Sequence, residues 1–165
     1  MYSRTSIFLK SMCLRAFLGL CSFAFCIGTV GAAVSDTLLP TNFKGTTVSH
    51  TYYTISYSEA DKQAEWVAYY LTPASINGLQ KRSSKFLPDP LLSNPVGPNS
   101  YTKSGYDRGH LCPAADMKLN AVSMTESFYM SNMSPQVPAL NRGIWSKLED
   151  KVRDWALEKN GLYVV

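Results

Sequence analysis

The hydrophobic pattern of this chain changes from strand-like to helix-like along its length, and this change restricts the fold most. Residues 48–57 and 64–71 are rich in β-branched and aromatic residues and flank a polar turn, so they predict the two arms of a hairpin. Beyond Pro138 apolar residues recur every three or four positions, which is typical of an amphipathic helix. These residues are Leu140, Ile144, Leu148, Val152 and Trp155. A hairpin followed by a helix over residues 138–159 predicts an α+β domain with a mainly antiparallel sheet.

The segments between these two regions predict shorter elements. Residues 81–104 are filled with proline, glycine, serine and asparagine, which favours an irregular connection. Long irregular segments inside compact domains are usually functional. Residues 106–112 and 128–133 predict two short strands, each ended by proline. Ser123 and Glu126 have the Ser-x-x-Glu spacing of a capping box at a helix start.

Residues 1–33 predict a secretory signal peptide. A basic start leads into an uncharged apolar stretch, residues 16–33, that closes on small residues. An uncleaved membrane anchor is one alternative, because about 18 uncharged residues approach the lower limit for a span. A mitochondrial presequence is another, because the segment contains no acidic residue. We expect cleavage, a secreted or periplasmic protein with no stable membrane association, and a mitochondrial location as the alternative.

Removal of the leader changes what charge and cysteine content imply. Three of the sixteen Lys and Arg residues belong to the leader, which leaves thirteen against twelve acidic residues. Net charge therefore gives no independent support for nucleic-acid binding, and attraction to phosphate must come from local clusters such as Lys81, Arg82 and Lys85. Of the four cysteines only Cys112 remains, so we expect no intrachain disulfide.

Residues 106–110, Tyr-Asp-Arg-Gly-His, form the first chemical motif. In an extended segment Arg108 and His110 point to the same face, which places a base beside a fixed positive charge and suits phosphate chemistry. The other histidine, His50, lies in an alternating strand pattern and is predicted to be structural. Cys112 would share the face of His110, but a zinc site lacks further ligands there. A cysteine nucleophile would leave the asparagine-bearing helix without a purpose.

Two further motifs complete a family resemblance. Residues 131–136 read Ser-Asn-Met-Ser-Pro-Gln, and residues 141–149 read Asn-Arg-Gly-Ile-Trp-Ser-Lys-Leu-Glu. Together with Asp-Arg-Gly-His, and in this order, they resemble the DNA/RNA non-specific endonuclease family, which includes mitochondrial endonuclease G and secreted bacterial nucleases. The resemblance runs from about Val48 to the C-terminus. It implies a ββα-metal nuclease core, in which a hairpin carries Arg108 and His110 and a following helix binds the metal.

The resemblance also implies the chemistry. We expect Mg²⁺-dependent hydrolysis of DNA, RNA or both with weak sequence preference, and Mn²⁺ as an alternative ion. His110 would deprotonate the attacking water, in keeping with an ordinary histidine pKa near 6.5. Asn141 would be the sole direct protein ligand of the metal, and Arg108 would contact the phosphate or the transition state. Glu149 lies about 12 Å further along a regular helix than Asn141, so it would act through metal-bound water or a neighbouring side chain.

The remaining site residues rest on the resemblance as well. Asn132 would position His110 or the phosphate. Arg82 and Arg153 would face the substrate, with a solvated basic loop as the alternative for Arg82 and a surface ion pair with Glu149 as the alternative for Arg153. Asp107 would point away from His110 and brace Arg108 or the loop.

We expect residues 34–47 to form a linker and residues 48–165 the nuclease domain. Family members continue beyond the apolar run 161–165, which predicts a strand that is only beginning, so we expect the domain to be incomplete at its C-terminus. Two alternatives follow: an exported nucleic-acid-binding domain that has lost turnover, and a secreted phosphodiesterase for small esters. The choice between DNA and RNA stays open, and a homodimer is one assembly that the sequence allows.

Overall fold

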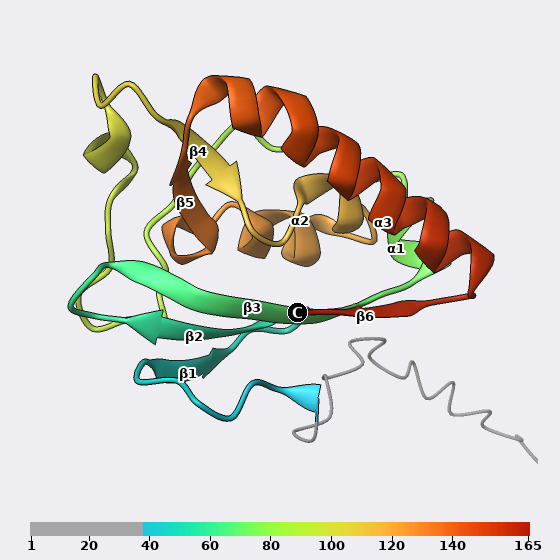
Figure 1. Cartoon of the computed structure of the whole chain (residues 1–165), viewed down its shortest axis with the longest axis horizontal. Helices are drawn as coiled ribbons and strands as arrows, with labels where there is room; N and C mark the ends of the chain where they lie inside the picture. Colours follow the sequence, from blue (N-terminus) through green and yellow to red (C-terminus); the bar gives the residue numbers. More distant parts are fainter. Residues whose placement is uncertain (1–37) are drawn as a thin grey trace, which may run out of the picture.

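The computed structural model describes residues 38–165, and the expected leader, residues 1–33, lies outside the described residues. An antiparallel sheet with the strand order β1-β2-β3-β6 forms the base of the domain. The helices and a second, two-stranded sheet lie on one face of it (Figure 1). The α+β class expected from the sequence is confirmed. The strands of the large sheet are β1 (Thr46–Ser49), β2 (Thr54–Ser58), β3 (Gln63–Leu71) and β6 (Leu162–Val164).

The single strand expected over residues 48–57 is two strands, because the chain turns at residues 50–53. The carboxylate of Glu126 fixes this turn, since it accepts hydrogen bonds from the backbone nitrogens of Thr51 and Tyr52 and from the Thr51 hydroxyl. Glu126 lies 75 positions from Thr51 in the sequence. A local pattern of β-forming residues therefore could not reveal the turn.

The core lies between the large sheet and the layer that covers it. β2 and β3 pair antiparallel as the hairpin predicted, and β6 pairs with β3 where the apolar run 161–165 predicted a strand. Ala156 from the covering helix α3 (Ser146–Glu158) and the fully buried Cys112 join the strand side chains. The large strand residues of this cluster are Val48, Ile55, Tyr57, Val67, Tyr69 and Leu71.

A small hairpin carries the first chemical motif. β4 (Asp107–His110) pairs antiparallel with β5 (Met133–Gln136), and the chain then enters the C-terminal helix, which gives the order ββα. The strand expected at residues 128–133 is displaced toward the C-terminus, because Met130–Asn132 form a 3-10 turn. Pro135 lies inside β5 instead of ending a strand. Each strand of a two-stranded sheet has a free edge, where a residue without an N–H group is tolerated.

The helix expected over residues 138–159 is interrupted. Leu140–Trp145 form an irregular π-type turn in which Gly143 leaves helical geometry (φ −110°, ψ −107°), and α3 (Ser146–Glu158) follows. Residues before and after Gly143 therefore do not share one continuous face. The predicted apolar stripe is largely a surface feature, with exposed fractions between 42 and 66% at Leu140, Ile144, Leu148 and Trp155.

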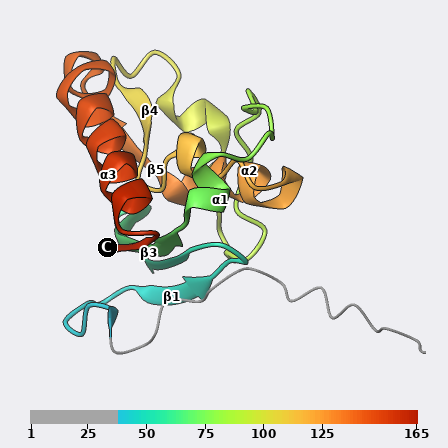
Figure 2. The same ribbon diagram turned by 90° about the vertical axis from the view of Figure 1, so that its right-hand side faces the viewer.

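Short helices complete the layer above the sheet, and Figure 2 shows α2 on the far side of the layer from α3, with α1 between them. They are α1 (Pro73–Ile76), α2 (Ala121–Ser127) and 3-10 turns at Pro98–Tyr101 and Ala114–Asp116. The capping box of α2 joins Asn120 and Ser123, three residues ahead of the expected Ser123 and Glu126 pair. Within residues 38–165 no helix has the length and apolar character needed to cross a membrane.

Candidate active site

A polar pocket of about 320 Å³ lies between β4, the irregular turn and α3. It contains every site residue expected from the sequence except Asn132. Four arginines line it, and they come from segments far apart in the chain. The full lining is Arg82, Arg108, His110, Pro113, Ala114, Ala115, Asn141, Arg142, Ser146, Glu149 and Arg153.

His110 ends β4 and is 7% exposed. Its ring packs edge-on against Phe128 at a centroid distance of 4.9 Å. Burial lowers the pKa of His110 to about 3, and the positive charge of Arg82 adds to the effect. Its Nε2 atom is buried and has no hydrogen-bond partner in the part of the chain that the structure describes. The imidazole is therefore neutral at pH 7, and a neutral imidazole has one unprotonated nitrogen that can accept a proton.

Arg108 lines the same pocket two positions earlier on β4, as the alternation of an extended strand requires. Its Nε and Nη2 atoms donate hydrogen bonds of 3.1 and 2.7 Å to the carbonyl oxygen of Pro98. The guanidinium also lies over the ring of Phe86, 4.9 Å from its centroid. These contacts hold the side chain in place without a carboxylate, so its positive charge remains available to an anion.

Asn141 is oriented by Asp107, which the sequence had placed against Arg108 or the loop. Asn141 Nδ2 donates a hydrogen bond of 3.0 Å to Asp107 Oδ2, and Arg142 binds both oxygens of the same carboxylate at 2.8 and 2.7 Å. The hydrogen bonds from Arg142 and Asn141 lower the pKa of Asp107. An ionised carboxylate only accepts hydrogen bonds. The nitrogen of the Asn141 amide must therefore face Asp107, and this leaves its oxygen as the free acceptor.

The oxygen donors of this pocket suit a hard divalent cation. Mg²⁺ retains most of its waters and takes few protein ligands, all of them oxygen. The Asn141 amide oxygen and the Glu149 carboxylate line one pocket and provide donors of that kind. Among residues 38–165, no three His, Cys, Asp or Glu side chains lie close enough together to hold a metal ion. The residues present thus fit a hydrated ion with few direct ligands better than a site closed by side chains.

Glu149 and Arg153 lie about one turn apart on α3, and both line the pocket. The expected alternative, an ion pair between them, is not formed. Arg153 Nη1 lies 2.8 Å from Asp116 Oδ1, and Arg153 Nη2 lies 2.5 Å from Asp150 Oδ1. Burial raises the pKa of Glu149 to about 7, and the positive charge of Arg153 opposes this shift. Glu149 therefore exchanges its proton near neutral pH.

Asn132 lies outside the pocket and is fully buried. Its Oδ1 atom accepts a hydrogen bond from Cys112 N, and its Nδ2 atom donates to the carbonyl oxygens of Cys112 and Ser127. Both amide hydrogens are engaged, so Asn132 has no free donor for a phosphate. This geometry does not favour positioning of the phosphate, one of its two expected roles. The bonds hold the backbone two residues beyond His110, which is compatible with the other role.

The histidine and cysteine outside the motif are structural in this fold. His50 Nε2 lies 3.0 Å from Asp89 Oδ2, and both side chains are almost completely buried. Cys112 is 0% exposed and belongs to the core, so it neither shares the pocket of His110 nor provides a nucleophile there.

Arg82 reaches the pocket from the irregular segment 81–104. Its guanidinium lies over the ring of Phe128, 5.2 Å from the centroid. The segment is held in place by backbone hydrogen bonds that Leu87 makes to Phe128 and Met130. Arg82 is therefore part of a defined pocket wall, whereas Lys85 is exposed and does not line the pocket.

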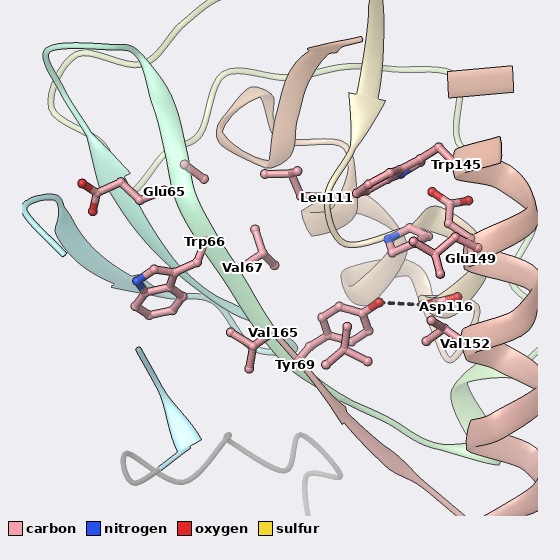
Figure 3. A pocket seen from close by; sticks show the side chains of 14 residues that line it. Glu65, Trp66, Val67, Tyr69, Leu111, Asp116, Trp145, Glu149, Val152 and Val165 are labelled. Atoms are coloured by element: carbon pink, nitrogen blue, oxygen red, sulfur yellow. Dashed lines mark hydrogen bonds between the residues drawn. The ribbon is translucent and has the colours of Figure 1, made fainter. Parts of the chain in front are cut away.

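A second cavity, of about 510 Å³, lies between β3, β6 and α3 (Figure 3). Its walls are mainly apolar and include Trp66, Trp145 and Val152. It does not contain His110 or any of the four arginines. Glu149 lines both cavities, so it stands at the boundary between the polar pocket and the apolar one.

The ββα order gives this chain the fold of the ββα-metal nucleases, with the polar pocket beside the hairpin and the helix. A sequence model of the DNA/RNA non-specific endonuclease family matches residues 31–165, and the chain belongs to that family. A nuclease from Nostoc sp. is 35% identical over 144 residues, which cover 84% of this chain and 50% of the relative. Mitochondrial endonuclease G from Bos taurus is 35% identical over 115 residues, which cover 68% of this chain and 38% of the relative.

A solved structure supports the same assignment. A chain in the crystal structure of the EndoG/EndoGI complex aligns with a TM-score of 0.67 and 33% identity, covering 73% of this chain and 52% of that one. The chain spans about half or less of the length of these relatives.

Three residues of the site region were not expected from the sequence to take part in it. Arg142 lines the pocket, and its place inside the Asn-Arg-Gly motif beside Asn141 was the available signal. Asp107 orients Asn141 across 34 positions of sequence. Asp116 binds Arg153 across 37 positions, and nothing in the local sequence pointed to that contact.

Proposed function

We propose that this protein is a metal-dependent endonuclease that hydrolyses phosphodiester bonds of DNA, RNA or both with little sequence preference. The observation that carries the proposal is a neutral, buried His110 in a pocket lined by four arginines and by the free amide oxygen of Asn141. Such a pocket offers a proton acceptor, positive charge for phosphoryl oxygens and an oxygen donor for a cation.

His110 acts as the general base in this proposal. Its pKa of about 3 in the free pocket keeps it unprotonated at pH 7 but would make it a weak base. A phosphodiester bound beside it adds a negative charge, which favours the imidazolium form and raises that pKa. Substrate binding therefore strengthens the base where it is needed, because the same anion that is attacked stabilises the proton taken from water.

The arginines bind and neutralise the phosphate. Arg108 is held by a backbone carbonyl and has no carboxylate partner, and the guanidinium of Arg82 packs over an aromatic ring. Arg142 and Arg153 are anchored by carboxylates and supply directed N–H groups more than net charge. Contacts of this kind read the phosphate backbone and not the bases, which accounts for weak sequence preference.

Asn141 would be the direct protein ligand of hydrated Mg²⁺, or of Mn²⁺ as a substitute, and Glu149 would act through metal-bound water. When bound, the ion supplies positive charge to the scissile phosphate and to the departing oxygen. Asp107 binds the amide nitrogen of Asn141 and so leaves the amide oxygen free to serve as a ligand. Glu149 has a pKa of about 7, and a cation held near it would favour its ionised form.

Plasmid digestion by this chain in Mg²⁺, beside an EDTA control, tests the proposal. We expect cleavage that EDTA abolishes and that His110→Ala lowers by at least about a hundredfold. Arg82→Ala should weaken cleavage and reduce its dependence on salt, because one phosphate contact is lost. Lys85→Ala is the matched control, since it removes a charge from the same segment but not from the pocket.

The outcomes separate the proposal from its rivals. A folded chain that retains DNA without cutting it supports the binding domain instead. A chain that hydrolyses a chromogenic diester but leaves plasmid intact supports a phosphodiesterase for small esters. Cleavage that persists in His110→Ala contradicts the assignment of the base.

We also propose that the mature protein is secreted or periplasmic, because residues 1–33 have the layout of a signal peptide. The alternative is a mitochondrial location, which the name of the Bos taurus relative includes. A mature N-terminus after Ala32 or Ala33 in the exported fraction supports export, and recovery from mitochondria contradicts it. A homodimer stays a prediction, which light scattering of the purified protein checks.

A further inference from the structure

Asp116 is a buried carboxylate that joins the large sheet to the pocket. It is 1% exposed and ends the 3-10 turn Ala114–Asp116. Its Oδ2 atom accepts a hydrogen bond of 2.8 Å from the hydroxyl of Tyr69 on β3, as Figure 3 shows. Its Oδ1 atom accepts one of 2.8 Å from Nη1 of Arg153 on α3. One side chain thus connects a strand of the core to an arginine of the pocket wall.

The hydrogen bond from the Tyr69 hydroxyl holds the Asp116 carboxylate in one position. Tyr69 is 2% exposed and belongs to the core cluster, so its hydroxyl has little freedom. A long arginine side chain on a helix otherwise samples many rotamers in solvent. Arg153 is instead 15% exposed at its side chain and is held at two of its nitrogens, by Asp116 and by Asp150.

Stability alone does not account for this arrangement. Removing two charges from water costs free energy, and a buried ion pair is often no more stabilising than apolar residues of the same size. Here the desolvation cost is incurred at Arg153, the arginine of α3 that lines the pocket. Asp116 also lowers the net positive charge near the pocket, so any benefit to phosphate binding must come from the direction in which Arg153 points.

We propose that Asp116, held by Tyr69, is a positioning residue that fixes the guanidinium of Arg153 in the pocket wall, where it binds a phosphate of the substrate. The inference rests on the proposed function, since it assigns a phosphate to this pocket. Arg153 reaches the phosphate with the N–H groups that remain free after Asp116 and Asp150 have taken theirs. The site thereby gains a donor with one defined direction.

The test compares Asp116→Asn, Arg153→Gln and the double variant in cleavage of a fluorescent oligonucleotide. We expect Asp116→Asn and Arg153→Gln each to raise KM about tenfold, the factor for one hydrogen bond to a charged group, with a smaller change in kcat. Asp116→Asn makes the protein more basic, so long-range electrostatics alone would lower KM. The double variant should be no worse than Arg153→Gln, because Asp116 acts only through that arginine.

Two more variants complete the test. Asp150→Asn is the matched control, because it removes the other carboxylate from the same guanidinium but lies at 71% exposure outside the pocket. Because an exposed ion pair contributes little, Asp150→Asn should raise KM by a clearly smaller factor than Asp116→Asn. Tyr69→Phe removes only the hydroxyl, and it should raise KM by a smaller factor than Asp116→Asn. Tyr69→Phe also keeps the proposal testable if Asp116→Asn does not fold.

Three results would overturn the proposal. The effects of Asp116→Asn and Arg153→Gln could multiply in the double variant, Asp150→Asn could match Asp116→Asn, or Asp116→Asn could lower Tm and kcat while KM stays unchanged.

Binding of the same oligonucleotide in EDTA, measured by fluorescence anisotropy, distinguishes this failure from failure of the proposed function. If the wild type binds the oligonucleotide in EDTA but does not cleave it in Mg²⁺, the endonuclease assignment fails. The positioning role is then decided by whether Asp116→Asn and Arg153→Gln weaken Kd by the same non-additive factor. A wild type that neither cleaves nor binds overturns both.

Discussion

Asn141 Nδ2 donates a hydrogen bond of 3.0 Å to Asp107 Oδ2, and this contact sets the direction of the amide oxygen that faces the pocket. Asp107 belongs to the same strand as His110, and Asn141 follows the second strand of the hairpin. The contact therefore connects the strand of the proposed general base, His110, with the amide proposed to bind the cation. It also explains why the motif Asp-Arg-Gly-His contains an aspartate that does not itself line the pocket.

Asp107→Ala should weaken metal binding. The Asn141 amide would lose the partner that fixes its orientation, and loss of a residue that orients a ligand typically costs about tenfold to a hundredfold in metal affinity. Titration of cleavage with Mg²⁺, and of free Mn²⁺ by electron paramagnetic resonance, measures the change. Arg142→Ala should have a smaller effect, because the bond between Asp107 and Asn141 remains. An unchanged Mn²⁺ affinity in Asp107→Ala would contradict the orienting role.

The folded protein should lose stability as the pH falls below about 6.5, and His110 should be one cause. Its pKa drops from 6.5 to about 3 on folding because the ring is buried. Between these values the unfolded chain binds a proton that the folded chain does not, so acid favours unfolding. Relative to His110→Asn, the wild type should lose roughly 2 to 3 kcal/mol between pH 7 and pH 4.5. Urea unfolding at both pH values checks this, and parallel pH profiles for the two proteins would disprove it.

Glu149 should have the opposite effect on the pH dependence of stability, because it should destabilise the folded protein as the pH rises. Its pKa rises from 4.5 to about 7 on folding, mainly through burial. Between these values the folded chain binds a proton that the unfolded chain does not, so raising the pH favours unfolding. Glu149→Gln should therefore have a higher Tm than the wild type at pH 8 in EDTA and a similar Tm at pH 4.5. Glu158→Gln, at the exposed end of α3, serves as control and should change neither value. Equal Tm differences at the two pH values would be the contrary result.

Asn132→Ala should destabilise the fold by about 3 kcal/mol, because it removes three buried hydrogen bonds and leaves both backbone groups of Cys112 without this partner. The free energy of unfolding in urea gives the measurement. Any loss of cleavage should follow loss of folding or displacement of His110. A variant with unchanged stability and no activity would restore a direct role at the phosphate.

The strands and the helix show which features a local sequence pattern can predict and which it misses. The hairpin of β2 and β3 was predicted because two runs rich in β-branched and aromatic residues flank a polar turn. The turn between β1 and β2 was missed, because it depends on a carboxylate 75 positions away. The helix over residues 138–159 was predicted from its apolar period, but the same period could not show that Gly143 breaks the helix or that Trp155 is exposed. Periodicity reports which residues share a face, and it does not say whether anything covers that face.

For the site, the sequence by itself determined which residues meet within one strand. Arg108 and His110 had to share a face because an extended backbone alternates its side chains, and the structure places both in one pocket. The tertiary structure alone decided the contacts that orient these groups: Asp107 with Asn141, and Asp116 with Tyr69 and Arg153. These partners lie 34 to 47 positions apart, where local backbone geometry has no influence. Burial of His110 and Glu149 was likewise settled only by packing, and it is burial that shifts their pKa values away from those of free side chains.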